Sequence, residues 1–286
     1  MAHAKYAAMH TEPVVLLHCS GSSGAQWRSL AGRLGSRYRL IAPDLIGYGA
    51  TAPWAGRAEF CLAQEAAVIR SLIGKLDGTV HLVGHSYGGA VALHIARTRP
   101  ELIRSLTLIE PSAFHLLRGG DEFDYAALRE ISDVAAYVNT MLASGDYLRA
   151  FGRFVDYWSG PGTWATMPQE KREAFAPQLA KVALDFRAIL SEPAELEDVQ
   201  GIALPTLLLQ GGCTTLPSRC VCKRLREALP VLFSVVRGAG HMLPLTHRDA
   251  VNALIAEHLD ANSNSTSGAF QPAPRADARV HLNTFL

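Results

Sequence analysis

The sequence predicts an α/β protein with a mostly parallel, doubly wound sheet and an inserted helical cap. Short apolar runs rich in β-branched residues, typical of strands buried on both faces, alternate along the chain with helical patterns. The alternation stops between residues 113 and 195, and one strand pattern runs directly into a glycine-rich turn at 84–89. These observations divide the chain into a core of 1–112 and 196–260, a cap of 113–195 and a disordered tail of 261–286.

Six apolar runs are expected to form the strands of the core. They are 13–17, 38–42, 80–83, 105–109, 205–212 and 232–236. The helices expected between and after them lie around 26–34, 60–76, 90–97, 218–229 and 248–259. Strands that alternate with helices in this way are typical of a parallel sheet covered on both faces.

Three helical patterns fill the predicted cap. Their apolar residues recur at three- and four-residue steps over 123–141, 147–158 and 179–189. Breaks fall at 159–162 and 192–193, where glycine and proline occur. We expect this insertion to cover the site, with most of its aromatic side chains packed inside the cap and a minority lining the substrate pocket.

The composition and charge of the chain argue against a nucleic-acid or membrane partner. The 286 residues are 49% hydrophobic and 19% charged, which is enough for a sizeable core in one large domain. The 27 basic and 26 acidic residues leave a formal charge of +1 without a clustered basic stripe, so a nucleic-acid partner is not expected. Neither a signal-peptide pattern nor an apolar run of ~18 residues is present. We expect a soluble, cytoplasmic protein with a small-molecule substrate and no membrane partner; the oligomeric state stays open.

The turn at 84–89 predicts a nucleophile. Ser86 stands at the apex of a strand–turn–helix stretch, where its backbone is forced toward positive φ. Gly84 and Gly88 flank it at two residues on either side, where a Cβ atom would collide with the turn or the packed helix. The bare Gly-x-Ser-x-Gly pattern also occurs by chance, but the strand, the helix and the additional Gly89 favour a serine held out above the sheet edge.

From these residues the chain resembles the α/β-hydrolase superfamily, and the resemblance runs through most of its length. It implies a sheet of the α/β-hydrolase type in a capped serine hydrolase. The stretch from Asp44 to Gly49 is similar to the superfamily's Asp-x-x-Gly-x-Gly signature, in which we expect Asp44 to bind the N–H groups of the turn. Residues 1–12 are weakly patterned, so the leading antiparallel strands usual in the superfamily are expected to be reduced or missing.

The resemblance also implies an oxyanion hole, formed by the backbone N–H groups of Ser20 and Tyr87. His18-Cys19-Ser20 stands where the superfamily usually reads His-Gly-x, so Cys19 is a departure that narrows the pocket or shifts the loop. Cys19 is itself a conceivable nucleophile, but the one base evident near it is His18, which we expect to be structural.

A serine hydroxyl needs a base within hydrogen-bond reach. Of the 11 histidines, His241 lies in a glycine-rich loop after the last strand, in the nucleophile-first chain order of the superfamily. His85 precedes the nucleophile and is expected to point away from it, while His81, His94 and His258 fall within strand or helix patterns. His241 is therefore the predicted base.

The acid that orients this base departs from the usual pattern. Most relatives carry it after the next-to-last strand, but the corresponding segment 210–217 contains no carboxylate. Glu110 follows the neighbouring strand, the position that haloalkane dehalogenases and some other relatives use, and a shift of one strand is only ~4.8 Å. Glu110 is the predicted acid; Asp44, Asp198 or no acid at all are the alternatives.

The predicted activity is hydrolysis of an ester, thioester or lactone through an acyl-enzyme, with Ser86, His241 and Glu110 and without cofactor or metal. The five cysteines do not form paired Cys-x-x-Cys motifs. Cys220 and Cys222 lie two apart on an expected helix and point away from each other, so free thiols are favoured over a metal site.

Two other functions stay open. One is hydrolysis of a carbon–carbon bond in a diketone-type substrate, for which an acidic hydroxy-dienoate would need cationic side chains in the cap; Arg149, Arg153 and Arg187 are the candidates. The other is a ligand receptor with the same fold and little turnover. Haloalkane and epoxide chemistry is disfavoured, because those relatives need Asp where this chain has Ser86.

Overall fold

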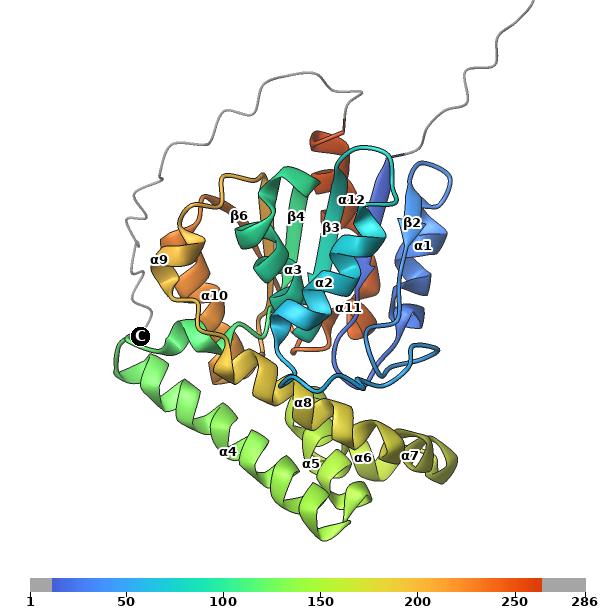
Figure 1. Cartoon of the computed structure of the whole chain (residues 1–286), viewed down its shortest axis with the longest axis vertical. Coiled ribbons are helices and arrows are strands. Elements are labelled where there is room, and N and C mark those ends of the chain that lie inside the picture. Colours follow the sequence, from blue (N-terminus) through green and yellow to red (C-terminus); the bar gives the residue numbers. More distant parts are fainter. Residues whose placement is uncertain (1–11, 264–286) are drawn as a thin grey trace, which may run out of the picture.

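The structure is a computed structural model that describes residues 12–263 (Figure 1). Within them lies one six-stranded sheet of strand order β2-β1-β3-β4-β5-β6, in which every pair of neighbours is parallel. The strands are β1 (Pro13–Leu17), β2 (Arg39–Ile41), β3 (Val80–His85), β4 (Ile103–Ile109), β5 (Thr206–Gly211) and β6 (Val231–Val236). The predicted parallel α/β fold is confirmed; residues 1–11, on which the expected loss of leading strands mostly rests, lie outside the described residues.

Helices cover both faces of the sheet. Because successive strand residues point to opposite faces, the side chains of each strand are divided between two buried clusters. On β1, Val15 and Leu17 belong to one buried cluster, and Val14 and Leu16 belong to another. The first cluster includes side chains of α2 (Leu62–Ile73), α3 (Tyr87–Thr98) and α10 (Leu216–Ala228). The second includes side chains of α1 (Arg28–Leu34) and α12 (Arg248–Ala261).

Between β4 and β5 the chain forms helices α4 to α8, called the helical insertion below. They are α4 (Glu122–Ser144), α5 (Tyr147–Ser159), α6 (Thr163–Thr166), α7 (Gln169–Phe175) and α8 (Leu179–Ser191). The three helical patterns of the sequence correspond to α4, α5 and α8. Figure 1 shows these three helices together at one end of the sheet.

Short elements connect the longer ones. They are the 3₁₀ helices η1 (Gly24–Trp27), η2 (Pro100–Leu102), η3 (Phe114–Leu117) and η4 (Ala176–Gln178), and the helices α9 (Leu196–Val199) and α11 (Leu243–Thr246). Helix α12 runs to Ala261, one residue into the predicted tail, and positions 264–286 of that tail lie outside the described residues.

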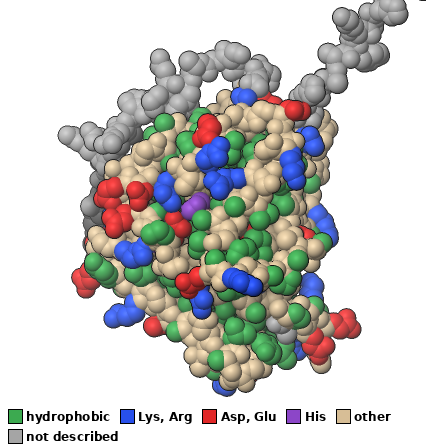
Figure 2. Space-filling view, in the orientation of Figure 1, with side chains coloured by type: hydrophobic (Ala, Val, Ile, Leu, Met, Phe, Trp, Pro, Cys, Tyr) green, Lys and Arg blue, Asp and Glu red, His purple; other side chains and the backbone are tan. Residues whose placement is uncertain are grey.

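On the face drawn in Figure 2, Lys and Arg side chains are interspersed with Asp, Glu and apolar side chains. No helix within residues 12–263 has both the length and the apolar character of a membrane span.

Candidate active site

Ser86 occupies the sharp turn between β3 and α3. Its φ is 55°, and its N–H donates to the carbonyl oxygen of Ile109 at 3.0 Å. A Cβ on Gly84 would lie 2.4 Å from the Gly88 carbonyl oxygen, and one on Gly88 would lie 2.5 Å from that of Leu17. Both glycines are therefore required by close backbone approach, and the strain of the turn presents the serine hydroxyl at the end of the sheet.

The structure brings Ser86, His241 and Glu110 into one hydrogen-bonded row. Ser86 Oγ lies 2.9 Å from His241 Nε2, and His241 Nδ1 lies 2.7 Å from Glu110 Oε2. All three are buried, with 6%, 2% and 1% of their surface exposed. Because an ionised carboxylate only accepts hydrogen bonds, Nδ1 carries the proton of the neutral imidazole and Nε2 is left to accept the serine proton.

The segment that lacks the usual acid instead supplies donors to Glu110. The Gly211 N–H donates to Oε1 and the Thr214 hydroxyl donates to Oε2, both at 2.6 Å. Burial raises the pKa of Glu110, but the hydrogen bond and charge interaction with His241 and the bonds from Thr214 and Gly211 outweigh it, so that the pKa lies below its ordinary value. Glu110 is thus held as a carboxylate facing the imidazole.

The alternative acids are engaged elsewhere. Asp44 accepts the N–H groups of Gly24 and Ala50, each at 2.8 Å, which confirms its predicted role in the turn. Asp198 lies on α9 and accepts the N–H of Glu195 at 2.9 Å.

His85 lies behind the predicted base. Its Nε2 lies 3.0 Å from the His241 carbonyl oxygen, and its Nδ1 lies 3.1 Å from Gln26 Nε2. Burial lowers the pKa of His85 to about 3, so the ring is neutral at physiological pH. A neutral ring with Nε2–H donating to the His241 carbonyl fixes the backbone of the His241 loop.

The loop after β1 carries the other residues predicted for the oxyanion hole. Ser20 lines the same cavity as Ser86, and Tyr87 is the first residue of α3. Among the residues that the structure describes, neither the Ser20 nor the Tyr87 N–H has an acceptor, so both amides are left as donors. Cys19 is buried and burial raises the pKa of its thiol to about 12, so it stays protonated and is unsuited to act as a nucleophile.

A cavity with about 230 Å³ of empty space opens beside Ser86. The side chains that line it come from the core and from α5 and α8 of the helical insertion, and they are Ser20, Ser86, Ser112, Phe154, Trp158, Asp185, Phe186 and Ile189. The Trp158 ring lies 4.1 Å from the His241 ring between centroids, so the insertion reaches the predicted base directly.

Asp185 is the charged residue of the cavity wall, and the sequence analysis missed it. The available signal was a Lys181–Asp185 pair, four residues apart, inside the apolar pattern 179–189. The cap arginines expected for an acidic substrate are not in the wall: Arg149, Arg153 and Arg187 are all exposed, and Arg187 pairs with Glu59 at 3.3 Å. None of the three candidates therefore lines the cavity, because these side chains project from α5 and α8 into solvent.

Comparisons with known proteins agree with this architecture. A family model described as "Alpha/beta hydrolase family" matches residues 14–254. The chain is 32% identical over 243 residues to a pimeloyl-[acyl-carrier protein] methyl ester esterase of Aeromonas hydrophila, covering 82% of this chain and 90% of that protein. It is 34% identical over 144 residues to a 2-hydroxy-6-oxo-2,4-heptadienoate hydrolase of Pseudomonas putida, covering 46% of this chain and 51% of that protein.

Among solved structures, the fold is similar to that of MGS-M2, an alpha/beta hydrolase enzyme from a Medee basin deep-sea metagenome library. The TM-score is 0.75 at 17% sequence identity, with 88% of this chain and 90% of that chain covered. The likeness thus extends over the sheet and the helical insertion together.

Proposed function

Because the chain belongs to the alpha/beta hydrolase family, we propose that it is a serine hydrolase that cleaves a carboxylic ester, thioester or lactone through an acyl-enzyme. The observation that carries the proposal is the buried row from Ser86 Oγ through His241 to Glu110, with contacts of 2.9 and 2.7 Å. These residues have the geometry of nucleophile, base and orienting acid.

In the first half of the proposed reaction, Ser86 Oγ attacks the carbonyl carbon while His241 Nε2 takes the serine proton. The N–H groups of Ser20 and Tyr87 donate to the oxyanion, where one such donor is worth ~10²–10³ in kcat. Glu110 stabilises the imidazolium that forms.

The tetrahedral intermediate then collapses, and the leaving alcohol, thiol or lactone oxygen takes the proton from His241. In the second half, a water molecule gives a proton to His241 and attacks the acyl-enzyme. Collapse of this second intermediate releases the carboxylic acid and returns the proton to Ser86.

Hydrolysis of a carbon–carbon bond is the second candidate, favoured by the likeness to the Pseudomonas putida hydrolase. That protein's named substrate is a dienoate, an anion, whereas the charged residue lining the cavity here is Asp185, and the three candidate arginines are exposed. The methyl ester esterase also matches over 82% of this chain, against 46% for the dienoate hydrolase. Ester cleavage is therefore the function that we propose.

We also propose that the helical insertion is the substrate-selecting cap, within the bounds 113–195 predicted from the sequence. It supplies Phe154, Trp158, Asp185, Phe186 and Ile189 to the cavity wall, whereas the three residues proposed for the chemistry all come from the core.

A fluorophosphonate probe, with peptide mapping of the labelled site, tests the proposed nucleophile. Labelling is expected at Ser86, and Ser86→Ala should abolish labelling and lower kcat by on the order of 10⁶. Ser112→Ala is the matched control, because it removes the hydroxyl 3.1 Å from Ser86 Oγ and should leave the label in place.

A substrate panel separates the two candidate reactions. Esters of increasing acyl length and a ring-fission diketone are assayed on the same preparation. Cleavage of the diketone with inert esters would replace the proposal by carbon–carbon hydrolysis, and no turnover of either without labelling would favour the receptor alternative.

A further inference from the structure

The wall of the cavity next to Ser86 contains an unusual carboxylate. Asp185 projects from α8 of the helical insertion and is 1% exposed. Its Oδ2 accepts the hydroxyl of Ser20 at 2.6 Å and that of Tyr48 at 2.5 Å. Burial, together with the Asp185 charge, raises the pKa of Tyr48, so its hydroxyl stays protonated and donates.

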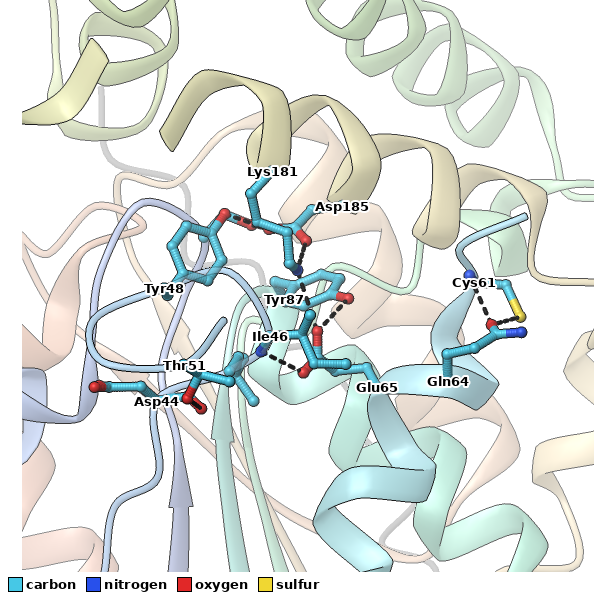
Figure 3. Close-up of polar contacts among 12 residues, drawn as sticks. Asp44, Ile46, Tyr48, Thr51, Cys61, Gln64, Glu65, Tyr87, Lys181 and Asp185 are labelled. Carbon is cyan, nitrogen blue, oxygen red and sulfur yellow. Dashed lines mark hydrogen bonds and ion pairs between the residues drawn. The ribbon is translucent and has the colours of Figure 1, made fainter. Parts of the chain in front are cut away.

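Lys181 holds this carboxylate in place from the side away from the cavity. Its ammonium bonds Asp185 Oδ1 and lies 3.1 Å from Glu65 Oε2, and Figure 3 shows the three side chains converging between α8 and the core. It also lies 4.9, 4.7 and 4.5 Å from the ring centres of Tyr48, Phe60 and Tyr87. The cation is therefore fully engaged by these groups and does not line the cavity.

The direction of the hydrogen bonds determines what this wall offers to a substrate. Ser20 has a single hydroxyl proton, and the bond to Asp185 uses it, so the Ser20 oxygen has only lone pairs left. Asp185 also acts as an acceptor, since Ser20 and Tyr48 donate to its Oδ2 and the Lys181 ammonium bonds its Oδ1. The remaining wall from the insertion is apolar, formed by Phe154, Trp158, Phe186 and Ile189.

We propose that Ser20 and Asp185 form an acceptor subsite that selects esters carrying a hydroxyl or ammonium donor close to the scissile carbonyl and disfavours esters with a carboxylate there. The inference rests on the proposed ester hydrolysis at Ser86. A donor on the substrate gains a hydrogen bond to the free lone pairs of this wall, an alkyl group gains none, and a second carboxylate is repelled by Asp185.

Three methyl esters of similar size test the subsite. They are methyl 3-hydroxybutanoate, its isostere methyl 3-methylbutanoate, and monomethyl succinate, each followed by acid release in a pH-stat. The wild type is expected to prefer the hydroxy ester over the methyl isostere by ~10-fold or more in kcat/KM, and to hydrolyse the succinate ester most slowly. Rates are normalised to the fraction of protein that the fluorophosphonate labels.

Asp185→Asn should remove this preference. The new amide turns its oxygen to Lys181 and its NH₂ to the hydroxyls of Ser20 and Tyr48, which can no longer donate to it. The Ser20 proton is then free to face the cavity. The ratio of hydroxy to methyl ester should fall toward unity, and the succinate ester should improve. Glu65→Gln is the matched control, because it alters the same ion network at a residue that does not line the cavity, and it should keep the wild-type ratio.

Ser20→Ala is a second variant that keeps the Lys181–Asp185 pair and the backbone N–H, and it should also lower the ratio. An unchanged ratio in Asp185→Asn and Ser20→Ala, or the same change in Glu65→Gln, would overturn the subsite. Hydrolysis of all three methyl esters without preference would remove the subsite and leave the proposed function standing. Absence of hydrolysis together with absence of label on Ser86 would instead remove the proposed function.

Discussion

The two sides of the cavity are built by different means. On the core side, the sheet register pairs His85 with Ile109, so Ser86 and Glu110 each follow a paired strand residue. On the side of the helical insertion, Asp185 is placed by side-chain contacts with Ser20 and Tyr48, which lie 165 and 137 residues away in sequence. Backbone pairing fixes the groups proposed for the chemistry, whereas tertiary docking of one helix fixes the groups proposed for selectivity.

The largest effect expected from a change on the core side, after loss of the nucleophile, is that of Glu110→Gln. The amide keeps the size of the side chain but removes the charge that faces the imidazolium, so kcat should fall by on the order of 10⁴. Steady-state kinetics and the melting temperature are measured on the same preparation.

Asp44→Asn is the control for this change, because the Asp44 carboxylate accepts the backbone N–H groups of Gly24 and Ala50 and its carbonyl oxygen accepts the Thr51 hydroxyl. It should lower the melting temperature and leave kcat within a few-fold. A normal kcat in Glu110→Gln together with a large loss of kcat in Asp44→Asn would assign the acid to Asp44. The acid would then not be the residue that follows β4.

The same contrast explains what the sequence could predict. Gly84, Ser86 and Gly88 form a local pattern with one steric explanation, and His241 follows a recognisable strand and glycine-rich loop. Glu110 could be selected from the sequence because the segment 210–217 has no carboxylate. Its hydrogen-bond donors Gly211 and Thr214 could not be predicted, because they come close to Glu110 only when β4 and β5 pair.

The place of Asp185 in the cavity wall could not be predicted from the sequence for a different reason. A charged pair four residues apart on a helix is usually a solvated face. Its burial here depends on Glu65, 116 residues from Lys181, and on the rings that surround the ammonium. Arg149 and Arg153, named as candidates for binding an acidic substrate, stand outside the apolar pattern of 147–158 and are exposed on α5.

The next largest effect is expected where the two sides meet, for Lys181→Met. Removing the ammonium leaves Glu65 and Asp185 as buried carboxylates without their counter-ion, a change that costs about 3–5 kcal/mol when one partner of a buried pair is lost. Burial already raises the pKa of Glu65 and Lys181 opposes that rise, so the variant should unfold at lower urea concentration.

Lys223→Met is the matched control for Lys181→Met. Lys223 pairs with Asp121, but the two side chains are 45% and 48% exposed, so the loss should not be measurable. Equal stability of the two lysine variants in urea would show that docking of α8 does not depend on the ion network.

The smallest effect distinguishes the two sides by their response to acid. Residues 122–191 of the helical insertion contain no histidine, whereas the core buries His85 and His258. Burial, followed by the nearby His81, lowers the pKa of His258 to about 4 from 6.5. Between these two pH values His258 binds more protons in the unfolded chain than in the folded one. The contribution of the neutral ring to the free energy of unfolding is therefore fully present above pH 6.5 and is lost as the pH falls toward 4.

His258→Gln removes this titration and keeps a polar side chain on α12. The free energy of unfolding in urea, measured at several pH values between about 7 and 5, should depend on pH less steeply than in the wild type, by up to about 1.4 kcal/mol per pH unit. His247→Gln, at the partly exposed residue before α12, is the control and should keep the wild-type slope. Equal slopes for His258→Gln and the wild type would mean that the core does not hold His258 neutral and that its titration does not contribute to the acid sensitivity.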